Sequence, residues 1–470
     1  MLNEDTICAI STPPGNGAIA VIRLSGSNAL TIAEKVFQPS KKGKILSNQK
    51  ANTIHHGLIK EDDTIIDDVM VNIFRSPNSY TGEDVVEISC HGSLYIQKKT
   101  LEILTNSGAR LAKPGEFTMR AFLNGKMDLS QAEAVADLIA GSSRAAHDVA
   151  INHMRGGFKD LIKSLRDQLL SFTSLIELEL DFSEEDVEFA DRKELMELVK
   201  KIIKLINSLI ESFKLGNVIK HGVPVAITGK PNVGKSTLLN ALLHEERAIV
   251  SEIAGTTRDV IEDVITIEGF SFRFIDTAGL RKVTDTIETI GIEKTFQKID
   301  QAYIVLYVID ATENTQEIDR LAGKIKKRLE GKDKKLIIIL NKVDMLNERK
   351  LSELKDLRNF SNFDSDDRIL YISAFYNENI DQLASLLLSI VKQRDTGEHD
   401  VIVSNTRHYE ALTKAREALE RVSEGMKTGI TGDFLAMDIR EALHYLGEIT
   451  GEVTTDEILG NIFSKFCIGK

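Results

Sequence analysis

Apolar residues follow different periods in successive parts of this chain, and each change of period predicts a change of structure. In residues 1–122, compact β-branched runs bounded by Gly or Pro predict strands at 18–26 and 84–92. Apolar residues at helical spacing predict helices at 27–37 and 93–108. The first region is therefore predicted to be an α+β domain.

Residues 123–221 are rich in helix-forming side chains. One helical face is marked by apolar residues three and four positions apart, namely Leu161, Leu165, Leu169, Phe172 and Ile176. A second helix is predicted over 192–215, and the acidic segment 181–186 interrupts the pattern as a polar turn. We expect these helices to form the first part of a scaffold.

The third region, residues 222–384, alternates strand-like and helical segments. This order predicts a mainly parallel sheet with helices on both faces. The turn at Glu268-Gly269 predicts its one antiparallel hairpin. The strand-like runs are 223–229, 264–269, 270–276, 302–310, 336–344 and 369–374.

Helical periodicity returns in residues 385–470. Amphipathic segments cover 406–426 and 434–450, and a polar helix start follows at 454–456. The simplest architecture is a sheet domain inserted into a helical domain, because the ends of an inserted domain usually lie close together at the surface.

Composition restricts the function further. The net charge of −12 argues against a surface that binds nucleic acid everywhere, and the basic run 324–335 is interpreted as a solvated helix face and loop. The three cysteines predict no disulfide framework, which fits a reducing cytoplasm. We expect no secretory signal at the N-terminus and no membrane span, because no apolar run is long enough.

The most specific motif is Gly-Lys-Pro-Asn-Val-Gly-Lys-Ser at 229–236, placed between a predicted strand and a predicted helix. Its backbone N–H groups can surround phosphate oxygens, and the helix N-terminus adds partial positive charge. Lys235 is expected to reach the β- and γ-phosphates, and Ser236 to ligate Mg²⁺.

Three later motifs complete a GTP site. Asp276 at a strand end can hold Mg²⁺ through water, and the Gly279 N–H can contact the γ-phosphate. The Asp344 carboxylate can accept hydrogen bonds from guanine N1 and N2, which adenine does not offer. Asn341 would brace the loop and meet N7, and the Lys342 stem would pack on the base.

The Ala374 N–H is expected to contact guanine O6, and Thr257 in Gly255-Thr-Thr-Arg-Asp to complete the Mg²⁺ shell. The full predicted set of GTP-binding residues is Gly229, Asn232, Val233, Gly234, Lys235, Ser236, Thr237, Ser251, Glu252, Ile253, Ala254, Gly255, Thr256, Thr257, Asp276, Thr277, Ala278, Gly279, Asn341, Lys342, Asp344, Ser373 and Ala374.

The position after Asp-x-x-Gly holds Leu280, where Ras-like enzymes place a water-orienting Gln. A monovalent cation held by Asn232 and switch-loop carbonyls could supply the missing positive charge. From the residues alone, Glu288 is either the group that orients water or a solvated loop acid.

The phosphate, switch and base motifs, together with the terminal Phe-Cys-Ile-Gly-Lys, resemble the tRNA modification GTPase family called MnmE or TrmE over the whole chain. The resemblance implies a Ras-like P-loop G domain inserted into a helical domain and preceded by an α+β tetrahydrofolate-binding domain. It also implies a K⁺-stimulated GTPase that modifies carbon 5 of the wobble uridine in certain tRNAs.

The resemblance further implies a homodimer formed through the N-terminal domain and a larger complex with the flavoprotein MnmG (GidA). The one-carbon donor would be 5,10-methylene- or 5-formyl-tetrahydrofolate, bound by Arg23, Glu87, Lys126 and Lys470. The K⁺ ligands would be Asn232, Ser251, Ile253 and Thr256, and the Mg²⁺ ligands Ser236 and Thr257. Glu288 would orient the attacking water, and Lys235 would act with it in catalysis.

Two questions stay open at this level. Cys467 is either a reactive thiol whose thiolate is stabilised by Lys465 or Lys470, or a packed small hydrophobe. The competing functions are a ribosome-assembly GTPase, which an acidic chain without an RNA-binding signature does not favour, and a GTP-switched scaffold with folate as a structural ligand.

Overall fold

The computed structural model describes residues 5–41, 43–181, 192–243, 248–250, 263–275, 299–332, 334–356, 360–363, 367–392, 401–464 and 466–469. It divides into two compact units. The first unit contains Met1–Ala136, His153–Arg192 and Glu424–Lys470, and the second contains Asp137–Asn152 and Lys193–Ser423. Each unit is described separately below.

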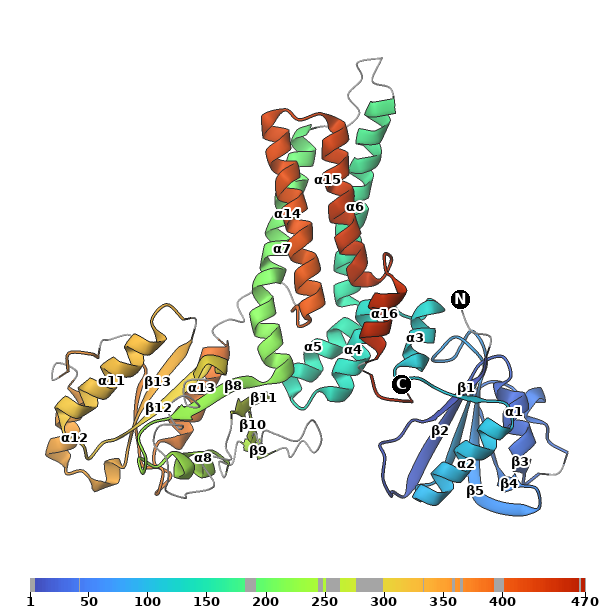
Figure 1. The fold of residues 1–470 in the computed structure, drawn as a ribbon, viewed down its shortest axis with the longest axis horizontal. Helices are drawn as coiled ribbons and strands as arrows, with labels where there is room; N and C mark the ends of the chain where they lie inside the picture. The colour runs from blue at the N-terminus through green and yellow to red at the C-terminus, as the bar shows by residue number, and fades with distance from the viewer. Residues whose placement is uncertain are drawn as a thin grey trace. The chain divides into compact units, whose positions relative to one another are not determined.

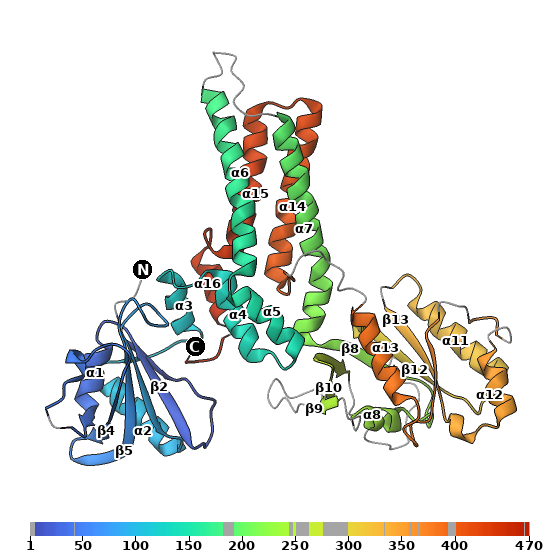
Figure 2. The ribbon, with the colours of Figure 1, turned by 180° about the vertical axis from the view of Figure 1, so that it is seen from behind.

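The first unit contains a seven-stranded sheet in the order β3-β4-β5-β6-β2-β1-β7. The helices α1 (Ala29–Val36) and α2 (Leu94–Asn106) pack on one face of it (Figures 1 and 2). The strands are β1 (Ile7–Ile10), β2 (Ile19–Ser25), β3 (Phe37–Pro39), β4 (Thr53–Glu61), β5 (Thr64–Phe74), β6 (Val85–His91) and β7 (Arg110–Leu111), and a 3-10 turn covers Leu46–Asn48.

The alternation of side chains along these strands decides which residues meet the helices. Ile22 and Leu24 of β2 and Ile88 of β6 are buried in the core beneath α1 and α2. Since successive side chains point to opposite faces, Arg23 and Glu87 point to the face away from these helices. This second face carries the predicted folate residues.

The rest of the first unit is helical: α3 (Glu116–Leu123), α4 (Leu129–Ala140, of which 137–140 belong to the second unit), α6 (Gly157–Asp181), α15 (Gly432–Thr450) and α16 (Asp456–Phe463). Ion pairs join Arg166 to Glu452 and Arg440 to Glu177, so α6 and α15 run antiparallel. Phe463 of α16 packs with Leu129 and holds the C-terminal segment near α3.

The second unit contains the other seven-stranded sheet, in the order β14-β13-β12-β8-β11-β10-β9. It is parallel from β14 to β11, whereas β10 pairs antiparallel with both β11 and β9. Its strands are β8 (Val223–Thr228), β9 (Ala248–Val250), β10 (Asp263–Ile267), β11 (Phe270–Phe274), β12 (Ile304–Asp310), β13 (Lys335–Asn341) and β14 (Ile369–Ile372).

Helices cover both faces of this sheet. Ile337 and Ile339 of β13 pack in one core with α8 (Lys235–Leu243) and α13 (Ile380–Lys392), and Ile338 and Leu340 pack in another with α11 (Thr315–Leu329) and α12 (Glu348–Lys355). This burial on both faces explains the continuous apolar run Leu336–Leu340.

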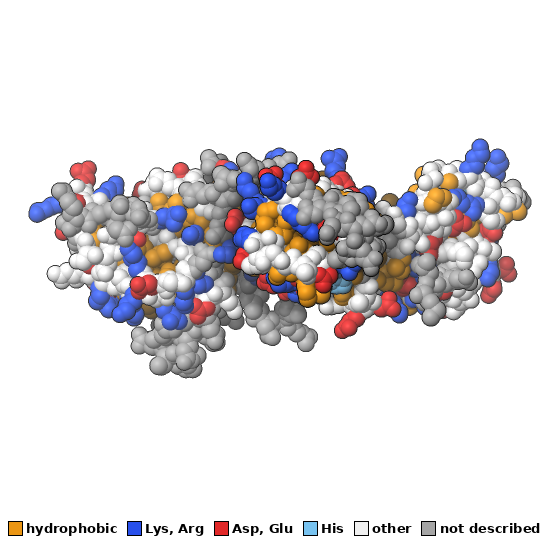
Figure 3. All heavy atoms as spheres, turned by 90° about the horizontal axis from the view of Figure 1, so that it is seen from above, with side chains coloured by type: hydrophobic (Ala, Val, Ile, Leu, Met, Phe, Trp, Pro, Cys, Tyr) orange, Lys and Arg blue, Asp and Glu red, His pale blue; other side chains and the backbone are white. Residues whose placement is uncertain are grey.

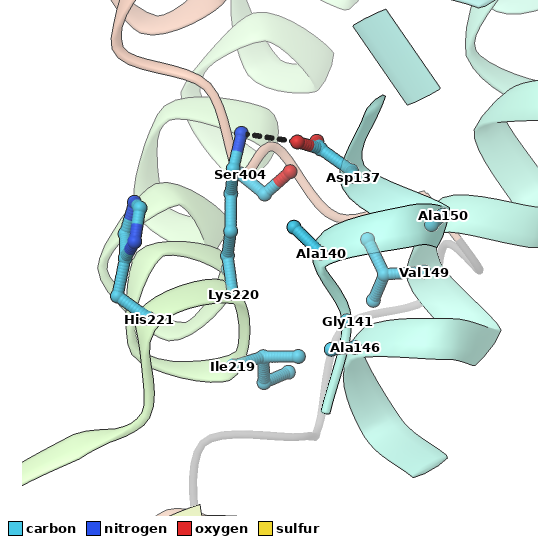
Figure 4. A pocket seen from close by; sticks show the side chains of 11 residues that line it. Asp137, Ala140, Gly141, Ala146, Val149, Ala150, Ile219, Lys220, His221 and Ser404 are labelled. Carbon is cyan, nitrogen blue, oxygen red and sulfur yellow. Dashed lines mark ion pairs between the residues drawn. The ribbon is translucent and has the colours of Figure 1, made fainter. Parts of the chain in front are cut away.

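Three more of the described helices lie mainly in the second unit: α5 (Arg144–Met154, with residues 153 and 154 in the first unit), α7 (Arg192–His221, with Arg192 in the first unit) and α14 (Thr406–Thr428, with residues 424–428 in the first unit). Only Gly222 separates α7 from β8, so this helix leads directly into the strand before the phosphate loop. A small pocket lies beside the end of α7, and Figure 4 shows Lys220 reaching Asp137 across it, at 2.7 Å.

The predicted strands and helices are confirmed, and the sheet of the second unit is mainly parallel with the expected β10–β11 hairpin. The expectation of one antiparallel pairing was wrong because β9 adds a second. The β4–β5 hairpin of the first unit was missed. Helix α13 continues past residue 384, where the G domain was expected to end. Leu387, Ile390 and Val391 of this helix pack in the same hydrophobic core as the sheet of the second unit. Of the predicted turn 181–186, all but Asp181 lies outside the described residues.

Two surface features bear on the sequence analysis. No helix in the described ranges is long and apolar enough to cross a membrane. On the face shown in Figure 3, Lys and Arg side chains are interspersed with Asp and Glu. Within the basic run, Lys326 pairs with Asp367 and Lys332 with Asp300.

A buried ion network in the first unit joins α3 to β7, to Asp5 ahead of β1 and to the loop before β6. Arg120 is 3% exposed and pairs with Asp5 at 2.7 Å, Glu83 at 3.1 Å and Glu116 at 3.2 Å. Arg110 pairs with Asp5 and Glu116, both at 2.6 Å. The hydrogen bond from Arg110 is the main reason why the pKa of Asp5 is lowered.

We expect Arg120→Met to destabilise the first unit by about 3–5 kcal/mol, because three carboxylates would lose a buried cation. Lys427→Ala is the matched control, since its ion pair with Glu424 lies at the surface and should contribute about 0–1 kcal/mol. Hydrogen exchange of β2 and β6 under increasing urea measures the difference, and equal protection of the two variants would contradict it.

Candidate functional site

The loop after β8 bends so tightly that glycine is required at two positions. Gly229 has φ +149°, and a Cβ atom there would lie 2.2 Å from the Val308 carbonyl oxygen. Gly234 has φ +94°, and its Cβ would lie 2.2 Å from the Asn341 side-chain nitrogen. Close packing against β12 and β13 therefore leaves no room for side chains at the two motif glycines.

Lys235 begins α8 and reaches back over the loop. Its Nζ donates hydrogen bonds to the carbonyl oxygens of Gly229 at 3.1 Å and Lys230 at 2.6 Å. Ser236 and Thr237 follow in the first turn, where backbone N–H groups and the helix dipole favour an anion. The arrangement has the parts of a phosphate-binding loop.

The Asn341 amide joins three loops. Its Nδ2 donates to the Val233 carbonyl at 2.8 Å, and its Oδ1 accepts from the Ala374 N–H at 3.0 Å. The side chain is 3% exposed, and Ser373 beside Ala374 is fully buried. One Nδ2 hydrogen is left for guanine N7. The Ala374 N–H already donates to the Asn341 Oδ1, so its predicted contact with guanine O6 would require one hydrogen shared between two acceptors.

The loop after β13 presents the remaining base-reading residues. Lys342 adopts φ +70°, and its Nζ pairs with Asp310 at 2.6 Å. Burial alone would raise the pKa of Asp310, but hydrogen bonds from Lys342 and Thr312 outweigh it and hold the pKa below the usual value. Asp344 lies exposed in the 3-10 turn Val343–Met345.

The structure therefore brings together the residues at 229–237, 341–344 and 373–374. The switch residues 251–257, the motif 276–279, Leu280 and Glu288 lie outside the described residues. The motif patterns did not identify Asp310, although its position at the end of the predicted strand 302–310 was a usable signal, and the structure places it beside Asn341.

A second cluster lies on the open face of the first unit's sheet. Arg23 and Glu87 are direct cross-strand partners in β2 and β6, and the guanidinium holds one carboxylate oxygen at 2.8 and 2.9 Å. The rings of Tyr80 and Phe117 lie 5.4 and 5.7 Å from the guanidinium carbon. Pairing and stacking fix the orientation of Arg23.

Asn72 extends this row by one strand. It is the cross-strand partner of Glu87 in β5, and among the described residues no hydrogen-bond partner reaches its buried Oδ1. The sequence analysis did not identify Asn72, because β5 was not predicted and the alternation that places it beside Glu87 was not visible.

The C-terminal segment is fastened to the same domain at two points. The Gly115 N–H donates to the Cys467 carbonyl at 3.3 Å, and the Ser11 hydroxyl donates to the Gly469 carbonyl at 3.1 Å. Ser11 follows β1, whose Ala9 is the cross-strand neighbour of Arg23. The segment thus ends beside the row that contains Arg23.

Two predicted folate residues and the terminal cysteine remain. Lys126 donates to the Pro77 carbonyl at 2.9 Å, in the loop that also carries Tyr80. Lys470 lies outside the described residues. Cys467 is exposed, so the alternative of a packed small hydrophobe is wrong.

Comparison with known proteins shows which family the chain belongs to. The family models "MnmE helical domain" and "GTP-binding protein TrmE N-terminus" match residues 129–467 and 6–126. A relative from Bacteroides thetaiotaomicron, named tRNA modification GTPase MnmE, is 54% identical over 470 residues and 100% of both chains. The chain belongs to the MnmE family of tRNA modification GTPases. A Flavobacterium johnsoniae relative of the same name is 52% identical over 477 residues, again covering 100% of both.

Family membership and the geometry of the phosphate loop agree. The protein is a GTPase that acts in tRNA modification, and it binds GTP. This outcome confirms the family resemblance and the predicted multidomain fold, and it favours tRNA modification over ribosome assembly.

We expect Asn341→Ala to weaken GDP binding by at least about tenfold, because the Val233 carbonyl and Ala374 N–H would each lose a buried partner. Asn347→Ala is the control, since that side chain caps α12 by accepting from the Lys350 N–H. Titration with a fluorescent GDP compares the two, and unchanged affinity of the Asn341 variant would show that this amide does not support the nucleotide site.

Proposed function

We propose that this protein is a K⁺-stimulated GTPase that, with a flavoprotein partner of the MnmG (GidA) type, modifies carbon 5 of the wobble uridine in certain tRNAs. An aminomethyl or carboxymethylaminomethyl group would be installed with a one-carbon unit from a tetrahydrofolate. The observation that carries the folate part is the row of Arg23, Glu87 and Asn72 on an open sheet face, with the C-terminal segment fastened beside it.

The side chains of this row fit a reduced folate. A pterin ring offers neighbouring N–H donors, and Glu87 keeps a carboxylate oxygen that Arg23 does not bind. The Asn72 Oδ1, which has no hydrogen-bond partner among the described residues, is a further acceptor in the same row. Because buried polar atoms are rarely left without a partner, we propose that a donor on the ligand bonds to it.

The remaining folate residues have complementary roles. Lys126 and Lys470 carry positive charge that suits the glutamate carboxylates of a folate tail. Tyr80 and Phe117 flank Arg23 and provide apolar walls that exclude water from one side of the row. When bound, the folate supplies a carbon at the oxidation level of formaldehyde or formate, and the protein's part is to bind and orient it.

For GTP hydrolysis we assign roles to the loop residues as follows. Lys235 would balance charge on the β- and γ-phosphates, and Ser236 and Thr257 would hold Mg²⁺. Asp344 reads the guanine edge, Asn341 and Ala374 frame it, and Lys342 packs on the base. Glu288 orients the attacking water, which Leu280 does not do.

Asn232 fits the role of a K⁺ ligand. It adopts φ +62° on the exposed side of the phosphate loop, and among the described residues no hydrogen bond engages its side-chain oxygen. Ser251, Ile253 and Thr256 would complete the oxygen cage. The cation would supply the positive charge that an arginine finger supplies elsewhere.

The assembly proposed for this chemistry is a homodimer joined through the N-terminal domain and bound to the flavoprotein in a heterotetramer or larger complex. The proposed location is the cytoplasm, where tRNA, folate and a reducing environment occur together. The domain limits proposed from the sequence are 1–122, 123–221, 222–384 and 385–470, and the third domain is extended to Lys392 because α13 runs to that residue. Cys467 is proposed as a reactive group because this residue is exposed.

Single-turnover GTP hydrolysis should be at least tenfold faster in KCl than in NaCl at equal ionic strength, since an arginine finger is worth about 10³–10⁵ in rate. Asn232→Ala should remove the difference while changing nucleotide affinity little. Asn240→Ala, an exposed Asn on α8, is the control and should keep the response. Equal wild-type rates in the two salts would refute the cation role.

Arg23→Ala and Glu87→Ala should each lower the affinity for 5-formyl-tetrahydrofolate by at least about tenfold, because each removes one charged partner of the ligand. GTP hydrolysis should be unchanged, since these residues and the phosphate loop belong to different units. Arg75→Ala, which breaks the Arg75–Asp84 pair in the same domain, is the control for calorimetric titration. Wild-type protein that binds no folate would contradict the proposal.

A further inference from the structure

The segment between the end of β12 and the first turn of α11 supplies carboxylates to both nucleotide-binding loops. Asp310 pairs with Lys342 of the loop that follows β13. Glu313 and Glu317 pair with Lys230 of the phosphate loop. The motif patterns identified the two loops but none of these three carboxylates. A carboxylate outside the motifs that binds a lysine inside the phosphate loop indicates a further residue that shapes the site.

The Lys230 ammonium is held mainly by Glu317, whose carboxylate lies at 2.6 Å, whereas that of Glu313 lies at 3.3 Å. Glu317 is itself fixed at two places. Its backbone N–H donates to the Asn314 side chain, which caps α11, at 2.7 Å. Arg320 holds both carboxylate oxygens from one turn later, at 2.7 and 2.8 Å. The carboxylate is therefore a defined anchor for Lys230.

The same hydrogen bonds keep both partners of this pair charged. They lower the pKa of Glu317 to about 2, the bond from Arg320 first and that from Lys230 second. The pKa of Lys230 is raised, chiefly by its hydrogen bond to Glu317. A carboxyl group with a lowered pKa loses its charge only when the pH falls toward that value. The ion pair is therefore complete at neutral pH.

Lys230 connects the Glu317 carboxylate to the lysine at the start of α8. The backbone carbonyl of Lys230 accepts a hydrogen bond of 2.6 Å from the Lys235 Nζ, which also donates to the Gly229 carbonyl at 3.1 Å. Pro231 follows directly, and a proline restricts the backbone of the residue before it. With its side chain bound to α11 and its backbone restricted, Lys230 presents its carbonyl to Lys235 in a fixed direction.

We propose that Glu317 is a positioning residue for GTP hydrolysis, which holds Lys230 so that the Lys230 carbonyl keeps the Lys235 ammonium directed at the phosphates. The inference rests on the proposed role of Lys235 in balancing phosphate charge, and it is independent of the folate and K⁺ proposals. Charge shifts between the phosphoryl oxygens as the transition state forms, and a fixed cation acts most strongly there. A loosely held Lys235 should therefore slow hydrolysis more than it weakens binding.

The test measures single-turnover hydrolysis at saturating GTP, with Mg²⁺ and K⁺ present, together with GTP affinity. Glu317→Ala should lower the rate constant about two- to fivefold, the range expected for a partly exposed ion pair, and should change affinity little. Lys230→Ala should have the same effect. The double variant should be no slower than either single variant, because both changes remove one contact. Lys230→Arg should keep the wild-type rate, since it retains a charged donor.

Two variants of the same helix are matched controls and should hydrolyse GTP at the wild-type rate. Asp319→Ala removes a carboxylate that binds the backbone of Ser361 and Asn362, and Lys324→Ala removes an exposed cation without an ion pair among the described residues. A slower rate in either control would show that the assay reports the integrity of α11, and it would refute the specific role of Glu317.

Three further results would overturn the proposal. The first is a wild-type rate for Glu317→Ala while Lys235→Ala is inactive, which would leave the role of Lys235 intact. The second is a double variant whose loss is the product of the two single losses, since Lys230 and Glu317 would then act separately. The third is weaker GTP binding with an unchanged rate constant, which would limit Glu317 to ground-state binding. Normal hydrolysis by Lys235→Ala would instead refute the role of Lys235, and the inference with it.

Discussion

The side-chain amide of Asn341 is the interaction on which the nucleotide site depends. It bonds at once to the phosphate loop through Val233 and to the last base loop through Ala374, and it occupies the space that a side chain at position 234 would need. A buried amide with both ends bonded is costly to disturb, because each lost partner leaves a desolvated polar group. The loops of β8, β13 and β14 are therefore held in one arrangement before nucleotide arrives, which reduces the ordering cost of binding.

The first unit is organised by a comparable constraint made from charges. Arg120 and Arg110 are held among three carboxylates, and this network fixes the start of α3, which supplies Phe117 to Arg23 and Thr118 to the Tyr80 hydroxyl. The carboxylate of Glu83 also accepts from the buried Ser25 of β2, beside Thr81. Rigid support beneath Arg23 and Tyr80 gives the open sheet face a defined shape without a ligand.

Strands and the phosphate loop were predicted correctly where their sequence pattern has a single physical cause. Buried parallel strands left uninterrupted apolar runs such as 336–340, and the phosphate loop left its glycines and Lys235, so both were located correctly. Short or half-exposed strands left weaker patterns: β5 alternates exposed and buried residues, and it was missed together with Asn72. The family resemblance supplied Arg23 and Glu87, and the antiparallel register explains why they meet.

Contacts between segments that lie far apart in the sequence could not be predicted, for a different reason. Nothing local in the chain shows that Gly469 reaches Ser11, or that the Ala374 N–H is shared with Asn341.

We propose that a GTP site and a folate site act together in one enzyme of tRNA modification, and reconstitution tests this proposal most directly. The protein would be incubated with the flavoprotein partner, a methylene-tetrahydrofolate, GTP, K⁺ and unmodified tRNA, followed by mass analysis of the wobble nucleoside. We predict a new substituent on carbon 5 of uridine whose mass rises when the folate carbon is isotopically labelled. A modified uridine without the label would contradict the folate role, and no modification despite GTP turnover would contradict the proposed reaction.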